Sequence, residues 1–406
     1  MEEKFFGPGD IAMASLDWDY SPWAMPQPSG RSYFDIPHLS TPIAGQRAYE
    51  NSPMVMGELL AAMERKFKVT GDERARRLMA RCYNGLRKVY ELSQPVAPGF
   101  FCKPYGGVMS DETSSDQYNY ALYAFDVYYP YATEAEKAEI REMVVKMADF
   151  WMSRDYSYKY YNNPLQWQRC RFLSFLKLAE KYSGDAKYAR EIARILSNPY
   201  EAAETPYQAD IEYHDRGEPC PDGRINYGAC AEAALTGFLS VFNLKGDAAG
   251  GAYYSRVLAP LTREAITDID PDGAAYRALL KDDRTGEFFE KDTKYTTYRP
   301  KDCAPPPWNS DQLLVSGPLR FGGHVSAGGV NALVQMAPEY APAADWVRAN
   351  ATKMLYRIAK AHLTHLEDPH GLYFPSCYWE TRVRSGDALG FWLWAYWTLR
   401  EREEKR

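Results

Sequence analysis

A helix–turn–helix unit with a Gly-Asp turn recurs along the chain and limits the folds that the chain can adopt. The turn reads Thr70-Gly71-Asp72, then Ser183-Gly184-Asp185, then Lys245-Gly246-Asp247. Glycine suits the left-handed residue that ends one helix, and aspartate suits the N-cap that begins the next. Each turn separates two segments with the apolar period of an amphipathic helix. The chain is therefore predicted to consist of helical hairpins.

Five hairpins are predicted, because the turns at 130–133 and 338–342 occupy the same place between helical segments. The predicted helix pairs are 54–68 with 73–92, 118–129 with 134–152, 165–182 with 186–196, 227–244 with 250–266, and 324–336 with 343–365. Residues 387–399 supply an eleventh helix, and the pattern does not place a twelfth.

Long polar segments join one hairpin to the next, at residues 93–114, 153–164, 197–225, 267–323 and 366–385. The first turns recur about every 50–60 residues, which exceeds the roughly 34–47 of compact helical solenoids. In an array of antiparallel hairpins these long connections emerge on one face, as in a scaffold with a functional side. We predict an all-α double ring of helices in one domain over 1–406, with 1–50 as an N-terminal arm packed on the barrel. An open superhelix is the structural alternative.

Composition and charge exclude several kinds of partner. The chain has 46% hydrophobic and 25% charged residues, as an ordinary globular protein does. A formal net charge of −6 without a basic block argues against nucleic acid as a partner. The most apolar run, around 389–399, is too short to span a bilayer, so no membrane association is expected. Nothing in the pattern indicates an oligomeric state.

The beginning of the chain and its cysteines bear on location. No basic segment followed by an apolar run opens the sequence, so we expect a cytoplasmic protein, or a periplasmic or secreted one if a leader was removed. The seven cysteines are scattered and odd in number, which favours reduced thiols over a disulfide framework.

The densest acidic stretch comes just before a predicted helix. It contains Asp111, Glu112 and Asp116, followed by Gln117. Carboxylates packed close together with little solvent repel one another, which raises the pKa of at least one of them. The result is a proton donor beside an ionised partner, as glycoside chemistry needs. We predict Asp116 as the general acid, with Glu112 or Asp111 as its partner.

Two other possible helix starts also carry an acid, Asp311 and Asp387. For both, simple helix capping is the preferred interpretation.

Aromatic residues make up 15% of the chain, and many of them fall in the long connections. Flat aromatic faces suit the C–H face of sugar rings, amides suit sugar hydroxyls, and arginine suits a carboxylate. The predicted substrate-binding residues are Gln117, Tyr158, Tyr160, Trp167, Arg169, His214, Trp308, His324, Trp379 and Arg382. Ordinary aromatic packing and ion pairing are the alternative explanation for these residues.

Two stretches of the sequence resemble metal sites. His362-x-x-His365 resembles a zinc pair, but histidine is common near a helix C-terminus. The stretch from Asp268 begins like a calcium loop, but position 12 is Leu279 rather than glutamate. We expect no metal and no other cofactor.

Over residues 50–400 the hairpins, their spacing and local patterns such as Thr70-Gly71-Asp72-Glu73-Arg74-Ala75 resemble the six-hairpin glycosidase superfamily. The resemblance implies an (α/α)6 toroid. Members include unsaturated glucuronyl and rhamnogalacturonyl hydrolases, and related toroids include polysaccharide lyases and sugar epimerases. In the unsaturated-uronyl hydrolases an inner-helix aspartate acts as acid/base with a second aspartate nearby. Asp116 matches the first by position, and the second is not assigned.

Together these patterns predict a glycoside hydrolase that acts on a small, acidic oligosaccharide by carboxylate acid/base catalysis. A lyase or epimerase on the same toroid would instead need a base such as His214 or His324. A non-catalytic glycan-binding protein would need the aromatic residues but none of the acids.

Overall fold

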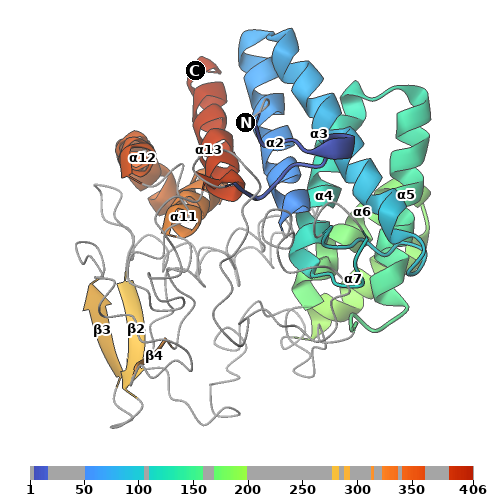
Figure 1. The fold of residues 1–406 in the computed structure, drawn as a ribbon. Helices are drawn as coiled ribbons and strands as arrows, with labels where there is room; N and C mark the ends of the chain where they lie inside the picture. The colour runs from blue at the N-terminus through green and yellow to red at the C-terminus, as the bar shows by residue number, and fades with distance from the viewer. Residues whose placement is uncertain are drawn as a thin grey trace.

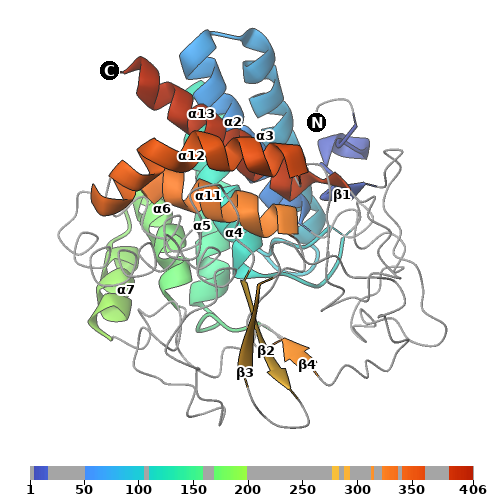
Figure 2. The same ribbon diagram turned by 90° about the vertical axis from the view of Figure 1, so that its left-hand side faces the viewer.

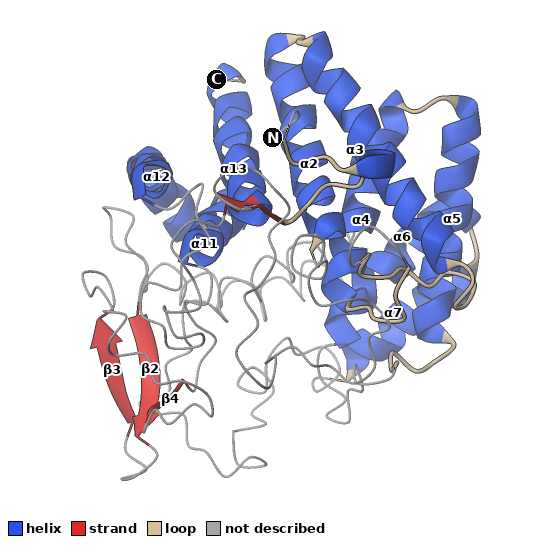
Figure 3. Ribbon diagram, in the orientation of Figure 1, coloured by secondary structure: helices blue, strands red, loops and turns tan. Residues whose placement is uncertain are grey.

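The computed structural model describes residues 4–16, 51–104, 109–158, 169–198, 277–282, 288–292, 312–314, 322–336, 341–361 and 384–405. Helices account for most of these residues (Figures 1 and 3). They are α2 (Ser52–Thr70), α3 (Glu73–Ser93), α4 (Ser115–Tyr128), α5 (Glu134–Met152), α6 (Leu173–Ser183), α7 (Ala186–Ser197), α11 (Gly322–Met336), α12 (Ala341–Ala361) and α13 (Gly386–Glu404). The 3-10 turns are η1 (Pro8–Asp10), η3 (Tyr129–Tyr131) and η4 (Arg169–Phe172).

The Gly-Asp turns within the described residues have the predicted geometry. Gly71 and Gly184 adopt left-handed φ angles of 66° and 72°. Asp72 accepts a hydrogen bond from the amide of Arg74, and Asp185 accepts one from the amide of Lys187, both at 2.8 Å. The sequence therefore predicted these turns correctly in residue and in role.

The predicted helices within the described residues are present, with small shifts at their ends. The largest shift is at the third hairpin, where the α-helix begins at Leu173 after a 3-10 turn rather than at 165. Such 3-10 turns are frequent at helix N-termini. The fourth hairpin, predicted at 227–266, lies outside the described residues.

The described helices form a continuous arc in which helices from the two ends of the chain meet. Along the inner layer, α6 packs on α4, α4 on α2, α2 on α13 and α13 on α11. The outer helices α3, α5, α7 and α12 pack on this layer. Figures 1 and 2 show α13 alongside α2, although hundreds of residues separate them. This contact brings the start of the last helix to the start of the first hairpin.

The described part of the N-terminal segment crosses this seam. Strand β1 (Ser15–Leu16) pairs with β5 (Arg384–Ser385), directly before α13 (Figure 3). The amide of Gly386 donates to the carbonyl of Ala14 at 2.7 Å, and Arg81 of α3 pairs with Asp10 at 2.7 Å. The segment therefore ties the first hairpin to the beginning of the last helix.

The long connection 267–323 contains short strands that the sequence did not predict. Strands β2 (Arg277–Asp282), β3 (Phe288–Asp292) and β4 (Gln312–Leu314) form an antiparallel sheet in the order β3-β2-β4. The helix start considered at Asp311 is wrong, because the next residues form β4 rather than a helix. Apolar runs this short do not distinguish a strand from a turn of helix.

Aromatic rings fill the core between α4, α5 and α6. Tyr118 is fully buried, stacks with Phe175 at a ring separation of 5.5 Å, and lies edge-on to Trp151 at 5.4 Å. Its hydroxyl donates to the carbonyl of Gly99 at 3.0 Å. Much of the unusual aromatic content therefore packs in the core.

No helix of the described residues is long and apolar enough to cross a membrane.

Candidate functional site

The acidic stretch before α4 is held against residues 101–103 by hydrogen bonds. Thr113 donates its hydroxyl to the carbonyl of Phe101, and Ser110 donates to the carbonyl of Lys103, both at 2.6 Å. The amide of Lys103 donates to the carbonyl of Glu112 at 2.9 Å. These bonds fix the place at which α4 begins.

The carboxylates of this stretch have different cationic partners. Glu112 is buried and lies 3.4 Å from the Nζ of Lys103. Asp116, in the first turn of α4, lies 3.4 Å from Nη1 of Arg171 on η4. The side chain of Asp116 keeps 22% of its surface exposed. Asp116 thus bridges the starts of α4 and α6 and can be reached by solvent, whereas Glu112 faces inward to a lysine.

A chain of amide hydrogen bonds joins the starts of three neighbouring inner helices. Gln117 of α4 donates from Nε2 to Oδ1 of Asn51, the N-cap residue of α2, at 3.4 Å. Asn51 donates from Nδ2 to Oδ2 of Asp387, in the first turn of α13, also at 3.4 Å. Gln117 is 1% exposed and Asp387 is 4% exposed. The predicted substrate-binding Gln117 is therefore linked to an acid of the closing helix.

Asp387 was assigned to helix capping from the sequence. In the structure it lies inside the first turn of α13, which begins at Gly386, and not in the flanking N-cap position. Sequence spacing could not reveal its link to Asn51, because ring closure alone brings residues 336 positions apart into contact.

Glu58 is a buried acid that the sequence reasoning missed. It lies in the middle of α2 with no exposed surface, and its carboxyl group faces α13 at Gly390. A Cβ atom on Gly390 would lie 2.3 Å from Oε2 of Glu58. Burial, and next the charge of Asp387, raise the pKa of Glu58 well above its ordinary value. The signal in the sequence was a single acid in the otherwise apolar stretch of residues 53–63.

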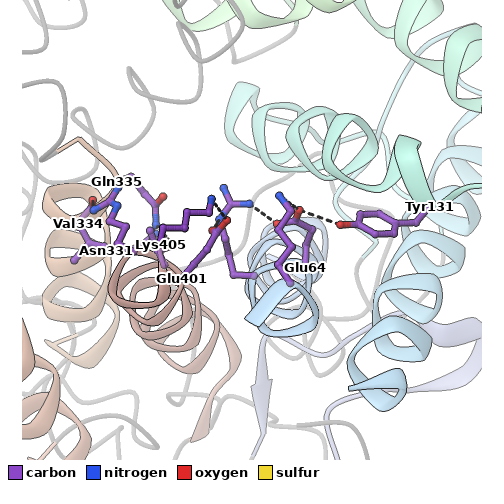
Figure 4. Close-up of polar contacts among 11 residues, drawn as sticks. Glu64, Tyr131, Asn331, Val334, Gln335, Glu401 and Lys405 are labelled. Atoms are coloured by element: carbon purple, nitrogen blue, oxygen red, sulfur yellow. Dashed lines mark hydrogen bonds and ion pairs between the residues drawn. The ribbon is translucent and has the colours of Figure 1, made fainter. Parts of the chain in front are cut away.

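The other end of the inner ring holds acids that are fully paired, as Figure 4 shows around Glu64 and Glu401. Glu64 forms ion pairs with Arg65 and Lys68 and accepts from the hydroxyl of Tyr131 at 3.3 Å. Arg65 also pairs with Glu401 at 3.0 Å. This network joins α2, α13 and the turn before α5, and it stabilises the ring at the end with the tight hairpin turns.

Two further predicted residues have protein partners. Arg169 pairs with Asp155 at 2.9 Å and lies over the ring of Tyr156 at 5.7 Å. Tyr158 is half-buried against Phe100, with ring centroids 5.1 Å apart. The side chain of His324 on α11 and the predicted residues Tyr160, Trp167, His214, Trp308, Trp379 and Arg382 lie outside the described residues. Within the ranges that the structure describes, no three His, Cys, Asp or Glu side chains gather as metal ligands would.

Comparison with solved structures places this architecture among known folds. A sugar epimerase from a ruminal bacterium matches 98% of this chain and 94% of its own, at 12% identity and a TM-score of 0.51. A family 76 glycoside hydrolase (mannosidase) from Bacteroides thetaiotaomicron matches 99% and 96%, at 8% identity and a TM-score of 0.52. A cellobiose 2-epimerase from Bacillus thermoamylovorans matches 99% and 94%, at 10% identity and a TM-score of 0.53.

No protein-family model matches the sequence, and no curated protein matches it. The solved structures nevertheless span almost the whole chain, and they are six-hairpin toroids. The predicted (α/α)6 toroid is therefore confirmed. At 8–12% identity the likeness extends to the fold, and that fold is shared by hydrolases and epimerases of sugars.

Proposed function

We propose that this protein is a glycoside hydrolase that acts on a small, acidic oligosaccharide, with Asp116 as its acid/base carboxyl group. The observation that carries the proposal is the position of Asp116. It lies in the first turn of an inner helix, partly exposed, with its carboxylate held 3.4 Å from Arg171. A carboxyl group fixed in this way at the mouth of a toroid can exchange a proton with a bound glycosidic oxygen.

The neighbouring acids are less suited to that role. Glu112 is buried beside Lys103, and its main chain takes part in the hydrogen bonds that fix the start of α4. We therefore infer that Glu112 supports the loop. Asp111 stays a candidate for the second carboxylate.

An acidic sugar is the proposed substrate class because two arginines lie together on η4, beside the start of α4. Arg171 faces Asp116, and Arg169 lies on the ring of Tyr156 with Asp155 as its partner. A guanidinium group over an aromatic ring is pre-organised to bind a second carboxylate. On this proposal, uronic-acid glycosides should react better than their neutral counterparts.

The test is a panel of 4-nitrophenyl glycosides, neutral and uronic, together with unsaturated uronyl disaccharides. Asp116→Asn should lower turnover by about 100-fold or more while the sugar still binds, because the amide cannot exchange the proton. Asp126→Asn is the matched control, since Asp126 lies on the same helix and pairs with Lys181 and Tyr182. Unchanged turnover in Asp116→Asn, or no cleavage of any panel member by the wild type, would overturn the proposal.

A sugar epimerase is the second candidate, because two of the solved structures with this fold are epimerases. Its base would be His214 or His324. Epimerisation would appear in NMR spectra as a new sugar with the glycosidic bond intact. A lyase would instead raise the ultraviolet absorbance of unsaturated uronate during reaction with polyuronate, and glycan binding without turnover would indicate a non-catalytic protein.

A further inference from the structure

The seam between α2 and α13 contains two acids close to the proposed site. Asp387 and Gly390 are three positions apart on α13, so they share one face of that helix. Gly390 lies directly against the carboxyl group of Glu58, and Asp387 is the charged group that acts on Glu58 across the seam. Glu58 and Asp387 therefore face the same interface between the first and last helices.

Glu58 has no cationic partner among the described residues. Neither carboxyl oxygen of Glu58 has a hydrogen-bond partner among those residues, and none of their ion pairs includes Glu58. The helices packed on α2, which are α3, α4 and α13, bring no charged group to Glu58 other than Asp387 within the described ranges. Two ionised carboxylates buried in this seam would repel each other strongly, so the pair retains one proton.

The local environments of Asp387 and Glu58 determine which of the two carboxyl groups is ionised. Asp387 lies in the first turn of α13, where the free N–H groups of the helix stabilise a negative charge, and it accepts a hydrogen bond from Asn51. Glu58 lies mid-helix with 0% of its surface exposed. The charge is therefore more stable on Asp387, and the proton on Glu58.

We propose that Glu58 and Asp387 form a carboxyl pair with a single charge, in which Asp387 is the second carboxylate of the site and Glu58 is its positioning residue. This inference rests on the proposed hydrolase function. Asp116 gives its proton to the departing oxygen as the bond to the anomeric carbon breaks. Water adds to that carbon and leaves its proton on Asp387, and exchange with solvent restores both acids.

The link to the rest of the site runs through amides. Asn51 connects Asp387 to Gln117, the residue next to Asp116. The two proposed catalytic acids, Asp116 on α4 and Asp387 on α13, are therefore connected through Asn51 at the start of α2. In this arrangement the hydrogen bond from Asn51 orients Asp387 at the start of α13. Glu58 stays protonated beside it, so the pair carries one negative charge and not two.

The test of the catalytic role uses the most reactive 4-nitrophenyl glycoside of the panel. Asp387→Asn should lower kcat by about 100-fold or more with the helical circular-dichroism signal retained. Asn51→Ala should lower kcat by about 10-fold, and it covers the case in which Asp387→Asn does not fold. Glu58→Gln, which keeps a neutral group, should retain most of the activity at neutral pH. Its pH profile should keep the alkaline decline that loss of the Asp116 proton causes and lose the part that ionisation of Glu58 adds. Unchanged kcat in Asp387→Asn or in Asn51→Ala overturns the role of Asp387, and an unchanged profile in Glu58→Gln overturns that of Glu58.

The proton on Glu58 has a readout that does not depend on any substrate. At neutral pH the difference between the infrared spectra of the wild type and Glu58→Gln should contain the C=O stretch of a protonated carboxylic acid. If this difference spectrum lacks the band, the pair is not as proposed. If Asp116→Asn leaves turnover unchanged while this band behaves as expected, the hydrolase proposal fails and the carboxyl pair stands.

Discussion

Replacing Glu58 by glutamine should make the protein more stable at neutral pH, because glutamine is neutral in both the folded and the unfolded chain. The folded-state pKa of Glu58 is raised above 4.5, first by burial and then by the charge of Asp387. Between the unfolded and folded pKa values, the folded chain binds more protons at this residue than the unfolded chain does. Protons therefore favour folding in that window.

The stability contributed by Glu58 is fully present below about pH 4.5, and it falls as the pH rises toward and through the folded pKa. One proton corresponds to a slope of at most about 1.4 kcal/mol in the free energy of unfolding for each pH unit. Glutamine has no proton to lose, so Glu58→Gln lacks this slope. The variant should therefore gain on the wild type with each step of pH above 4.5, until the folded pKa is passed.

The assay is urea unfolding followed by helical circular dichroism at several pH values, for the wild type and two variants. Glu64→Gln is the matched control, because Glu64 is also buried on α2 but pairs with Arg65 and Lys68. Loss of that carboxylate removes an ion-pair partner from both Lys68 and Arg65, although Arg65 keeps Glu401, and should lower stability by about 1–3 kcal/mol. If the curves of Glu58→Gln and the wild type stay parallel across this pH range, Glu58 is ionised in the folded state, and the reasoning on the carboxyl pair is wrong.

Three further stability predictions follow from the helix packing and caps, each checked by thermal unfolding. Gly57→Ala would place a Cβ 2.6 Å from the carbonyl oxygen of Tyr120, where α2 meets α4, and should cost about 1–3 kcal/mol or more. Gly71→Ala meets no atom within 4 Å but requires a left-handed φ of 66°, so it should cost about 1 kcal/mol, and equal losses at the two glycines would contradict the steric argument. Thr133→Ala removes the capping box with Glu136 and should cost about 1 kcal/mol, whereas Thr133→Ser should stay close to the wild type.

Local chemistry made the hairpins predictable from the sequence. The turns at Gly71 and Gly184 depend on residues within a few positions of one another, as does the capping box at Thr133. The short strands at 277–292 were missed because their hydrogen bonds come from partner strands, and their own residues show no clear alternation.

The candidate site was less predictable, because neighbours in sequence proved to have different partners. Asp111, Glu112 and Asp116 were expected to form one acidic cluster, yet Glu112 pairs with Lys103 and Asp116 pairs with Arg171. Glu112 precedes the extended N-cap residue Ser114, whereas Asp116 lies in the first turn of α4, so the two side chains leave the backbone from different local structures. Acids that are close together in the sequence are therefore not close together as an unpaired acidic cluster in the structure.

The two buried glutamates of α2 show which end of the ring is used for stability and which is available for chemistry. Glu64, toward the tight turns, has two cations and a tyrosine hydroxyl as partners, as a buried carboxylate requires. Glu58, toward the long connections, has no hydrogen-bond partner among the described residues and faces a second acid. A hydrophobic residue in its place would fill the seam at a lower cost in free energy. An acid with so little local support is expected where function and not folding selects the residue, and this agrees with the proposed reactive face at the starts of α4, α2 and α13.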